Sequence, residues 1–317
     1  MRAGTAAEQP DFRFVGSDLQ RPECVLAGAS GRLYASDRRG GVTCIEPDGT
    51  QRLIGRSALV PNGIALRRDG SFLVANMSDA GGVWQIDAGG HIKPWLMEVD
   101  GVALPKVNFV SVDEQDRAWV CVSARDTGDA YPLQVKSGFI VLVERGVARV
   151  VADGLHYTNE CRLAATGEHL LVNETFGRCV TRFALRADGS LHRRERIASF
   201  SDGDFPDGLA LDAEGGVWVV CVGSNRVYRV TPQGLVQTII DDSVPETTAA
   251  LEAAYQAGTL TRPMLSGATG RSLQNISSLA FGGPDLRTAV LGCLNGTALA
   301  SFTAPVAGLP PAHWHWV

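Results

Sequence analysis

The chain has 317 residues, of which 45% are hydrophobic, and a net charge of −5, as expected for a globular protein with a substantial core. This mildly acidic balance lacks the basic footprint of a nucleic-acid-binding protein, and no apolar run reaches the roughly 18 residues of a membrane-spanning helix. We therefore expect neither nucleic acid nor a membrane as a partner. The sequence does not indicate an oligomeric state.

The N-terminal segment, residues 1–10, is rich in Ala, Gly, Gln and Glu and has no apolar stretch, unlike a secretory signal. The seven cysteines form no Cys-x-x-Cys pair, and most lie in apolar runs typical of strands. Such cysteines are typical of buried thiols in a reducing compartment, so we expect a cytoplasmic protein. We expect one domain over residues 1–317, with a flexible segment at 1–11 and a tail at 304–317.

A unit consisting of a polar residue, an apolar strand, a turn and a second apolar strand occurs six times without a gap. Its first positions are separated by 39, 46, 51, 48 and 70 residues and are occupied by Glu23, Asn62, Asn108, Asn159, Asp207 and Ser277. A spacing near 45 residues is about the length of a four-stranded propeller blade.

A further strand pair follows most of these units, which gives four strands a unit. The pattern predicts an all-β protein: a six-bladed β-propeller of four-stranded antiparallel blades around a central channel. The last unit shows too few strands after Ala300. We expect either the segment Phe12–Val15 or the C-terminal tail to supply the missing outer strand, because an unpaired outer edge favours aggregation.

Two segments depart from the repeat. The insertion between Asp241 and Asn275 contains a predicted helix near 243–258, with Ser243 or Asp242 as its cap and Pro245 in its first turn. It could be a lid, an oligomer contact or a decorated loop. The second segment, Ser123–Ser137, is long enough to overhang one end of the channel, where a loop on a rigid scaffold can carry a site.

The first strand of every propeller blade lines the channel, so the six first positions converge on one rim. They comprise two carboxylates, three amides and one hydroxyl, which are hard oxygen ligands that suit Ca²⁺, Mg²⁺ or Mn²⁺ rather than zinc. Two carboxylates facing each other across a narrow channel would repel without a cation between them. The sequence therefore predicts a divalent metal site; the alternative is that these residues only bond neighbouring strands or buried water.

Several short motifs, in this order and spacing, resemble the gluconolactonase family that includes regucalcin (senescence marker protein). They are Pro61-Asn62-Gly63-Ile64, Lys106-Val107-Asn108, Thr158-Asn159, Phe205-Pro206-Asp207-Gly208-Leu209 and Leu279-Ala280-Phe281-Gly282-Gly283. The resemblance extends from about residue 14 to residue 303. It implies a six-bladed propeller with one divalent cation, most often Ca²⁺, with Mg²⁺, Mn²⁺ or Fe as alternatives.

Carried over residue by residue, the resemblance implies Glu23, Asn159 and Asp207 as metal ligands, with Asn108 beside them. It also implies Asp207 as a candidate general base, and Lys106 in the place where some relatives keep a substrate-contacting Arg. Two positions depart from the family pattern: Phe109 follows Asn108 where many relatives have Asp, and Glu160 follows Asn159 where they usually have Gly. Glu160 could face the channel or turn outward.

The resemblance leads to the hypothesis of metal-assisted hydrolysis of a sugar lactone or a related small cyclic ester. The cation would polarise the carbonyl, and Asp207 would activate water. The candidate substrate-binding residues are Asn108, Lys106, Asn62, Arg125, Tyr131, His156 and Tyr157.

Two other hypotheses remain open. The Phe109 and Glu160 departures allow an isomerase, cyclase or synthase on the same metal-centred scaffold. A non-enzymatic calcium-binding propeller is the third. His313 and His315, two residues apart near the C-terminus, are weaker metal candidates because Pro310 and Pro311 indicate a tail there.

Overall fold

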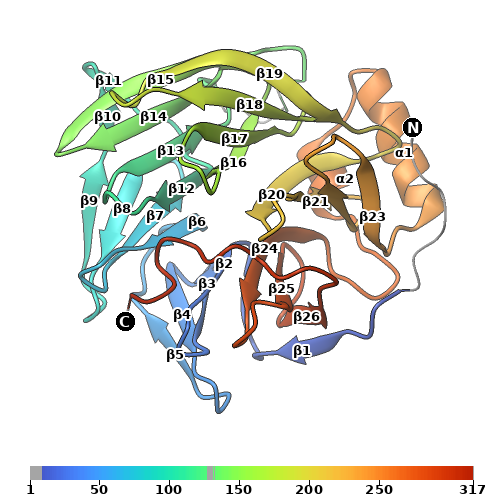
Figure 1. The fold of residues 1–317 in the computed structure, drawn as a ribbon, viewed down its shortest axis with the longest axis horizontal. Coiled ribbons are helices and arrows are strands. Elements are labelled where there is room, and N and C mark those ends of the chain that lie inside the picture. The colour runs from blue at the N-terminus through green and yellow to red at the C-terminus, as the bar shows by residue number, and fades with distance from the viewer. Residues whose placement is uncertain (1–8, 127–130, 132, 317) are drawn as a thin grey trace.

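The structure, a computed structural model, describes residues 9–126, 131 and 133–316. In this part of the chain, six four-stranded antiparallel sheets surround a central channel, which confirms the predicted six-bladed propeller (Figure 1). None of the helices found in these residues has the length and apolar character needed to cross a membrane.

Each blade runs outward from the channel. The innermost strands are β2 (Val25–Ala27), β6 (Pro61–Leu66), β12 (Phe109–Val112), β16 (Thr158–Leu163), β20 (Phe205–Leu211) and β24 (Ile276–Gly282). The second strands are β3 (Leu33–Asp37), β7 (Phe72–Asn76), β13 (Ala118–Val122), β17 (His169–Glu174), β21 (Val217–Val222) and β25 (Thr288–Cys293). The third strands are β4 (Gly41–Ile45), β8 (Val83–Ile86), β14 (Gly138–Glu144), β18 (Cys179–Leu185), β22 (Arg226–Val230) and β26 (Leu299–Thr303).

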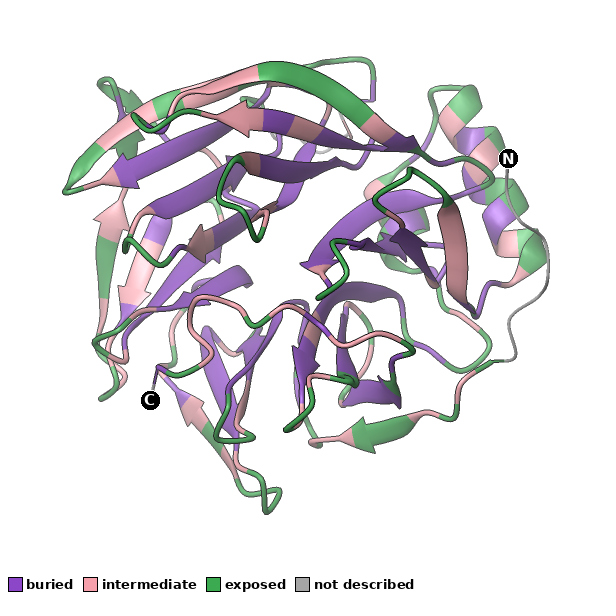
Figure 2. Ribbon diagram, in the orientation of Figure 1, coloured by how far each residue is buried: buried purple, intermediate pink, exposed green. Residues whose placement is uncertain are grey.

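The outer strands are β5 (Gln51–Ile54), β9 (Ile92–Leu96), β15 (Val147–Leu155), β19 (Leu191–Ser199), β23 (Val236–Asp241) and, in the last blade, β1 (Arg13–Val15). β1 pairs antiparallel with β26, so the N-terminal segment closes the ring. This was one of the two alternatives predicted from the sequence. A small hairpin, β10 (Glu98–Val99) with β11 (Val102–Ala103), lies outside the blades. Burial decreases outward: the inner strands are mostly buried, whereas the residues of the outer strands are mostly intermediate or exposed (Figure 2).

The turn between the first two strands of a blade shows why the repeat folds locally. In the fifth blade Asp212 accepts hydrogen bonds from the backbone N–H groups of Glu214 and Gly216 at 2.9 and 2.8 Å, and from the Trp218 indole at 2.8 Å. Gly215 has φ +78°, a conformation that disfavours a side chain. One aspartate therefore shapes the turn and fixes the buried tryptophan that follows it.

The insertion contains the predicted helix, α1 (Pro245–Gln256), and a short helix α2 (Arg262–Ser266) that the sequence did not predict. The expected caps were wrong: Val244 is the N-cap and provides no side-chain bond, while Asp242 instead accepts the backbone N–H groups of Ser272 and Leu273. Pro245 occupies the first helical position, where its missing N–H has no consequence.

Helix α1 is fixed to the fourth and fifth blades beside the channel end where the innermost strands begin. Glu252 pairs with Arg178 at 2.7 Å and accepts the Gly203 backbone N–H at 2.8 Å. The Tyr255 hydroxyl donates to the Phe176 carbonyl at 2.6 Å. Leu251 and Leu265 pack with Tyr157 and Phe205 in one cluster, so the insertion forms part of the wall around that end.

The Glu252–Arg178 pair makes a pH-dependent contribution to stability. Hydrogen bonding from Arg178 lowers the pKa of Glu252 from 4.5 to about 2. A lowered pKa stabilises the fold fully above about pH 5, and that contribution is lost as the pH falls towards 2. We expect Glu252→Gln to destabilise the protein at pH 7 and the difference from wild type to shrink steadily below pH 5 in urea unfolding.

The control for this comparison is Glu195→Gln, which removes an exposed pair with Arg182. Its effect should stay within a few tenths of a kcal/mol at pH 7. If the difference in unfolding free energy between Glu252→Gln and wild type did not depend on pH, the lowered pKa of Glu252 would be contradicted.

Candidate active site

The six repeated polar residues converge at the channel end where the innermost strands begin. In four blades the pairing of the first two strands is interrupted there by a bulge or irregularity, at Asn62-Gly63, Asn159-Glu160, Asp207-Gly208 and Ser277. A bulge changes the direction of the side chains at its site. The glycines allow close blade contact: a Cβ on Gly208 would lie 2.5 Å from the Ser277 carbonyl oxygen.

Asn62 connects three blades. Its amide nitrogen donates to Glu23 Oε1 at 2.8 Å and to the Asn108 carbonyl at 2.9 Å. Ser277 donates to the Glu23 carbonyl at 2.8 Å, so it acts on the backbone rather than extending the set of oxygens. These bonds fix the Glu23 carboxylate at the channel rim.

Asn159 is oriented by a chain of hydrogen bonds. Its amide nitrogen donates to the Thr175 hydroxyl at 3.0 Å, and Thr175 donates to the Pro206 carbonyl at 2.7 Å. Asn173 donates to the carbonyls of Asp207 and Gly208 at 3.0 and 2.9 Å, which fixes the bulge that carries Asp207. The second strand of the fourth blade therefore positions both Asn159 and Asp207.

The carboxyl groups at this end are buried and repel one another. Burial raises the pKa of Asp207 well above its ordinary value, and the charges of Glu23 and Glu160 raise it further. Burial also raises the pKa of Glu23 to about 7, against the lowering effect of Arg21. A positive charge within reach of both groups would favour their ionised forms.

The residues present fit a hard divalent cation. Among the described residues, three buried side-chain oxygens of the ring have no hydrogen-bond partner: Glu23 Oε2, Asn62 Oδ1 and Asn159 Oδ1. With the Asp207 carboxylate they form an all-oxygen donor set of the type that Ca²⁺ and Mg²⁺ prefer. The described residues contain no group of three or more His, Cys, Asp or Glu that could hold a metal ion, so such a site would depend on amide oxygens.

Glu160 faces the channel rather than turning outward. Its Oε2 accepts from Arg162 at 2.8 Å and from the Leu209 backbone N–H at 3.1 Å. Arg162 also stacks on Phe109 at 4.6 Å. Phe109 and Glu160, the two departures from the family pattern, therefore both contact Arg162. This arginine supplies positive charge beside the buried carboxylates.

Arg21 is a site residue that the sequence analysis missed. It lies two residues before Glu23, whose backbone N–H donates to the Arg21 carbonyl at 2.8 Å. Its guanidinium donates to the Pro61 carbonyl at 3.5 Å, next to Asn62, and it lowers the pKa of both Glu23 and Asp207. Arg21 precedes the first repeat unit, so the alignment of the six units did not include it.

Two of the predicted substrate-binding residues lie together beside this end. Tyr131 packs edge-on against Tyr157, and Arg262 stacks on the Tyr131 ring at 4.6 Å. Burial raises the pKa of Tyr131, with further contributions that include the charge of Asp207. Tyr131 is thus close enough to Asp207 to sense its charge.

The other predicted substrate-binding residues have protein partners. Lys106 pairs with Asp79 at 3.0 Å, and His156 bonds the Leu133 carbonyl through its ring. Arg125 pairs with Asp153 and stacks on Phe139 at 4.5 Å, so a substrate would have to displace both contacts. Residues 127–130 and 132 of the predicted overhanging loop lie outside the described residues.

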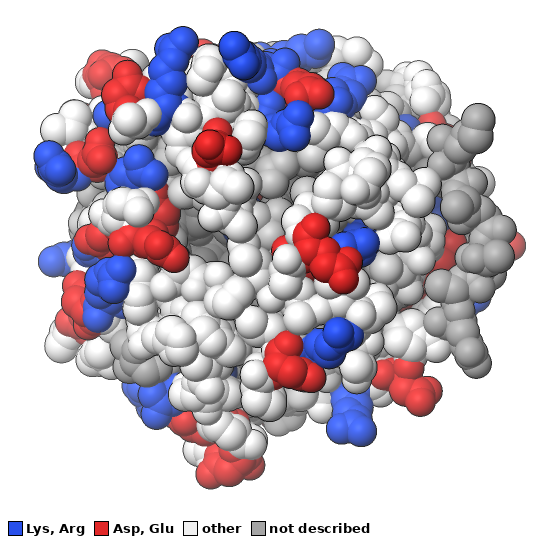
Figure 3. All heavy atoms as spheres, in the orientation of Figure 1, with Lys and Arg blue, Asp and Glu red and all other residues white. Residues whose placement is uncertain are grey.

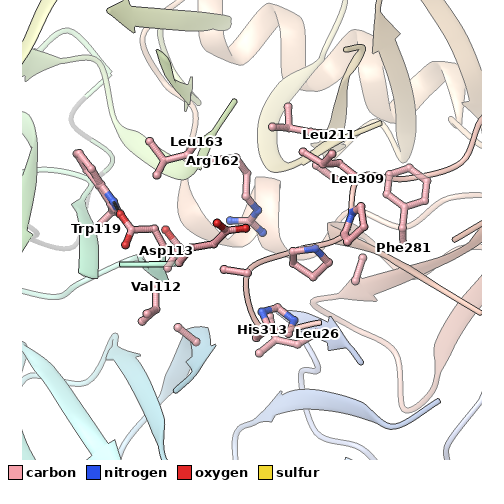
Figure 4. A pocket seen from close by; sticks show the side chains of 18 of the residues that line it. Leu26, Val112, Asp113, Trp119, Arg162, Leu163, Leu211, Phe281, Leu309 and His313 are labelled. Carbon is pink, nitrogen blue, oxygen red and sulfur yellow. Dashed lines mark hydrogen bonds between the residues drawn. The ribbon is translucent and has the colours of Figure 1, made fainter. Parts of the chain in front are cut away.

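A cavity of about 310 Å³ lies at the opposite end of the channel, where the innermost strands finish (Figure 4). Its lining includes Val112, Leu163, Leu211 and the tail residues Leu309–His313. The tail bonds across this end, with the Leu309 N–H donating to the Leu211 carbonyl. On the face that the tail crosses, basic and acidic side chains are interspersed (Figure 3).

His313 lies in this tail and lines the cavity, far from the ring of oxygens. Burial lowers its pKa to about 4. Residues 304–316 are thus a docked tail that covers one end of the channel.

The family model described as the SMP-30/gluconolactonase/LRE-like region matches residues 72–253, and the chain belongs to this family. A 6-deoxy-6-sulfogluconolactonase of Pseudomonas putida is 29% identical over 176 residues, which are 54% of this chain and 57% of that protein. The match thus spans little more than half the length of this relative.

Two solved structures show that the fold is shared. A gluconolactonase from Xanthomonas campestris has a TM-score of 0.70 at 20% identity, with 96% of this chain and 94% of that chain covered. A calcium-binding protein, regucalcin, from Agrobacterium tumefaciens has a TM-score of 0.61 at 15% identity, with 95% and 93% covered. These similarities, together with the family match, confirm the resemblance inferred from the sequence motifs.

The Arg162–Glu160 pair leads to a stability prediction. Arg162→Met removes a partly buried counter-charge and leaves Glu160 beside Glu23 and Asp207, so we expect a loss of about 3 kcal/mol. The control Arg182→Met, in the same blade, breaks a pair whose partners are both exposed and should cost at most about 0.5 kcal/mol. Urea unfolding in the presence of a chelator measures both; equal losses would contradict a special role for Arg162.

Proposed function

We propose that this protein is a divalent-metal-dependent lactone hydrolase. The observation that carries the proposal is the set of buried oxygens without partners, which lies beside a carboxylate whose pKa is raised. Family membership supports the same conclusion, as do the lactonase names of the relatives. The substrate is a small molecule with a cyclic ester.

Glu23, Asn159 and Asp207 are the proposed metal ligands, with Asn108 beside them. Calcium is the preferred candidate because the donors are all oxygen, and because a structural relative is named as a calcium-binding protein. When bound, the cation supplies Lewis acidity that polarises the lactone carbonyl and stabilises the oxyanion formed on attack.

Asp207 is the proposed general base. It takes a proton from the water that attacks the carbonyl carbon, and it returns that proton to the ring oxygen when the carbon–oxygen bond breaks. The product is a hydroxy acid. Burial and the neighbouring carboxylates raise the pKa of Asp207, and a bound cation would act in the opposite direction by favouring the ionised carboxylate that accepts the proton.

The remaining polar groups position the substrate. Asn62 and Asn108 lie at the rim beside Glu23, where their amides can contact the substrate's polar groups. Tyr131 and Tyr157 offer aromatic surface to the ring of the lactone, while Lys106, Arg125 and His156 line the approach in this proposal.

The activity test uses a panel of sugar lactones and a pH-stat that measures the release of acid. We expect turnover that a chelator abolishes and Ca²⁺ restores, and a fall in kcat of about 10²-fold to 10⁴-fold for Asp207→Asn. Glu23→Gln should weaken calcium binding in calorimetry. The control Asp188→Asn changes an exposed turn aspartate and should leave all three measurements unchanged.

Activity that ignored the chelator and the Asp207→Asn change would contradict this mechanism. Hydrolysis in H₂¹⁸O should place one ¹⁸O atom in the product carboxylate. A product without ¹⁸O would instead favour the isomerase, cyclase or synthase alternative, and calcium binding without turnover of any substrate would favour a non-enzymatic propeller.

A further inference from the structure

The balance of charge at the site changes sign when a divalent cation is present. The charge of Glu160 raises the pKa of Glu23, and both carboxylates raise that of Asp207. Arg21 lowers the pKa of Glu23 and Asp207, and Arg162 lowers that of Glu160. With the carboxylates ionised, these five groups carry one net negative charge. A divalent cation converts that to one net positive charge, which an anionic group on the substrate could neutralise.

The two arginines are not equivalent. Arg162 lies on the inner side of the ring, where it pairs with Glu160 and stacks on Phe109. Both arginines are partly buried, but Arg162 lines the cavity at the opposite end of the channel, whereas Arg21 lies in the turn before the first blade, at the end where the innermost strands begin. Arg21 is therefore the guanidinium that a substrate arriving from solvent can reach.

The backbone directs Arg21 towards the site. Its φ of +50° is unusual for a residue with a side chain, and the bond from the Glu23 N–H to its carbonyl closes a tight turn. The guanidinium extends across to Pro61, which precedes Asn62, and its hydrogen bond to that carbonyl is long at 3.5 Å. With respect to the residues that the structure describes, a weak contact to one carbonyl leaves most of the five guanidinium donors available to a ligand.

A second cation borders the same approach. Arg262 lies over the ring of Tyr131, and this tyrosine senses the charges of both Asp207 and Arg21. Guanidinium groups therefore lie both beside the ring of oxygens and on the aromatic wall. Guanidinium groups are well suited to bind planar or tetrahedral oxyanions through paired hydrogen bonds.

We propose that Arg21 selects lactones that carry an anionic oxygen group, a carboxylate or a sulfonate, on the substituent that points out of the channel. This inference rests on the proposed lactonase function and narrows its substrate class. Arg21 acts by binding the substrate, while Asp207 and the metal ligands perform the chemistry on the ring.

The kinetic test compares matched lactones that share one ring: glucono-1,5-lactone, its 6-carboxylate and its 6-sulfonate. We expect wild type to prefer the anionic lactones in kcat/KM. Arg21→Gln should lose about tenfold or more of kcat/KM for them, mainly through KM, and stay within about twofold for the neutral lactone. Arg21→Lys should retain part of the preference because it keeps the charge but not the paired donors.

The control variant is Arg38→Gln, which removes an exposed arginine from the same blade. It should leave the preference unchanged, which separates a direct contact from the general field of the protein. Equal losses for neutral and anionic lactones in Arg21→Gln would mean that Arg21 only balances Glu23 and Asp207, and would overturn the proposal.

A binding measurement keeps the inference testable if no lactone is hydrolysed. Calorimetry on the calcium-loaded protein compares glucarate, a dianion, with gluconate, a monoanion that lacks the second carboxylate. We expect tighter binding of glucarate, and loss of that difference in Arg21→Gln with calcium affinity equal to or above that of wild type. Equal affinity for the two acids in the wild-type protein would overturn the proposal, whereas absent turnover alone would overturn only the lactonase function.

Discussion

The repulsion among Glu23, Glu160 and Asp207 in a buried channel is the constraint on which the rest of the site depends. Each of these carboxyl groups has a raised pKa, with burial as the first cause. Such a cluster is unfavourable unless positive charge compensates it. Arg162 supplies compensation from the inner side and Arg21 from the outer side, and the free oxygens between them suit a divalent cation.

The propeller tolerates this cost because uncharged groups fix much of the backbone at the site. The bulge at Asp207-Gly208 is held by uncharged hydrogen bonds from Asn173 and Thr175, and the Asn159 side chain is held by Thr175. Removing or adding a cation therefore changes the electrostatic free energy of the site with little need for the strands to move. This preorganisation is what catalysis by fixed dipoles and charges requires.

The sequence predicted the ring of oxygens because its signal was repeated six times, each time with a turn and a second strand at the same offset. It could not decide the direction of Glu160, since a bulge determines which way that side chain points, and the bulge at Asn159-Glu160 lacks the glycine present at Asn62-Gly63 and Asp207-Gly208. Arg21 was missed because it lies in the turn before the first unit and repeats nowhere. The cap of α1 was wrong because Asp242 binds a distant loop at Ser272 and Leu273, a tertiary contact that no local pattern shows.

Phe109 and Glu160, the two departures that left the chemistry open, are connected in space through Arg162. The glycine usual at position 160 in the family has no side chain to bring charge into the channel, whereas Glu160 brings one together with its own counter-ion. The pair adds little net charge by itself, although Glu160 still raises the pKa of Glu23 and Asp207. The pair instead determines where the charges lie. Arg162 lies between the ring of oxygens and the cavity closed by the tail, and its charge lowers the pKa of His313. The inner wall of the site therefore differs from a glycine-lined one in polarity rather than in net charge.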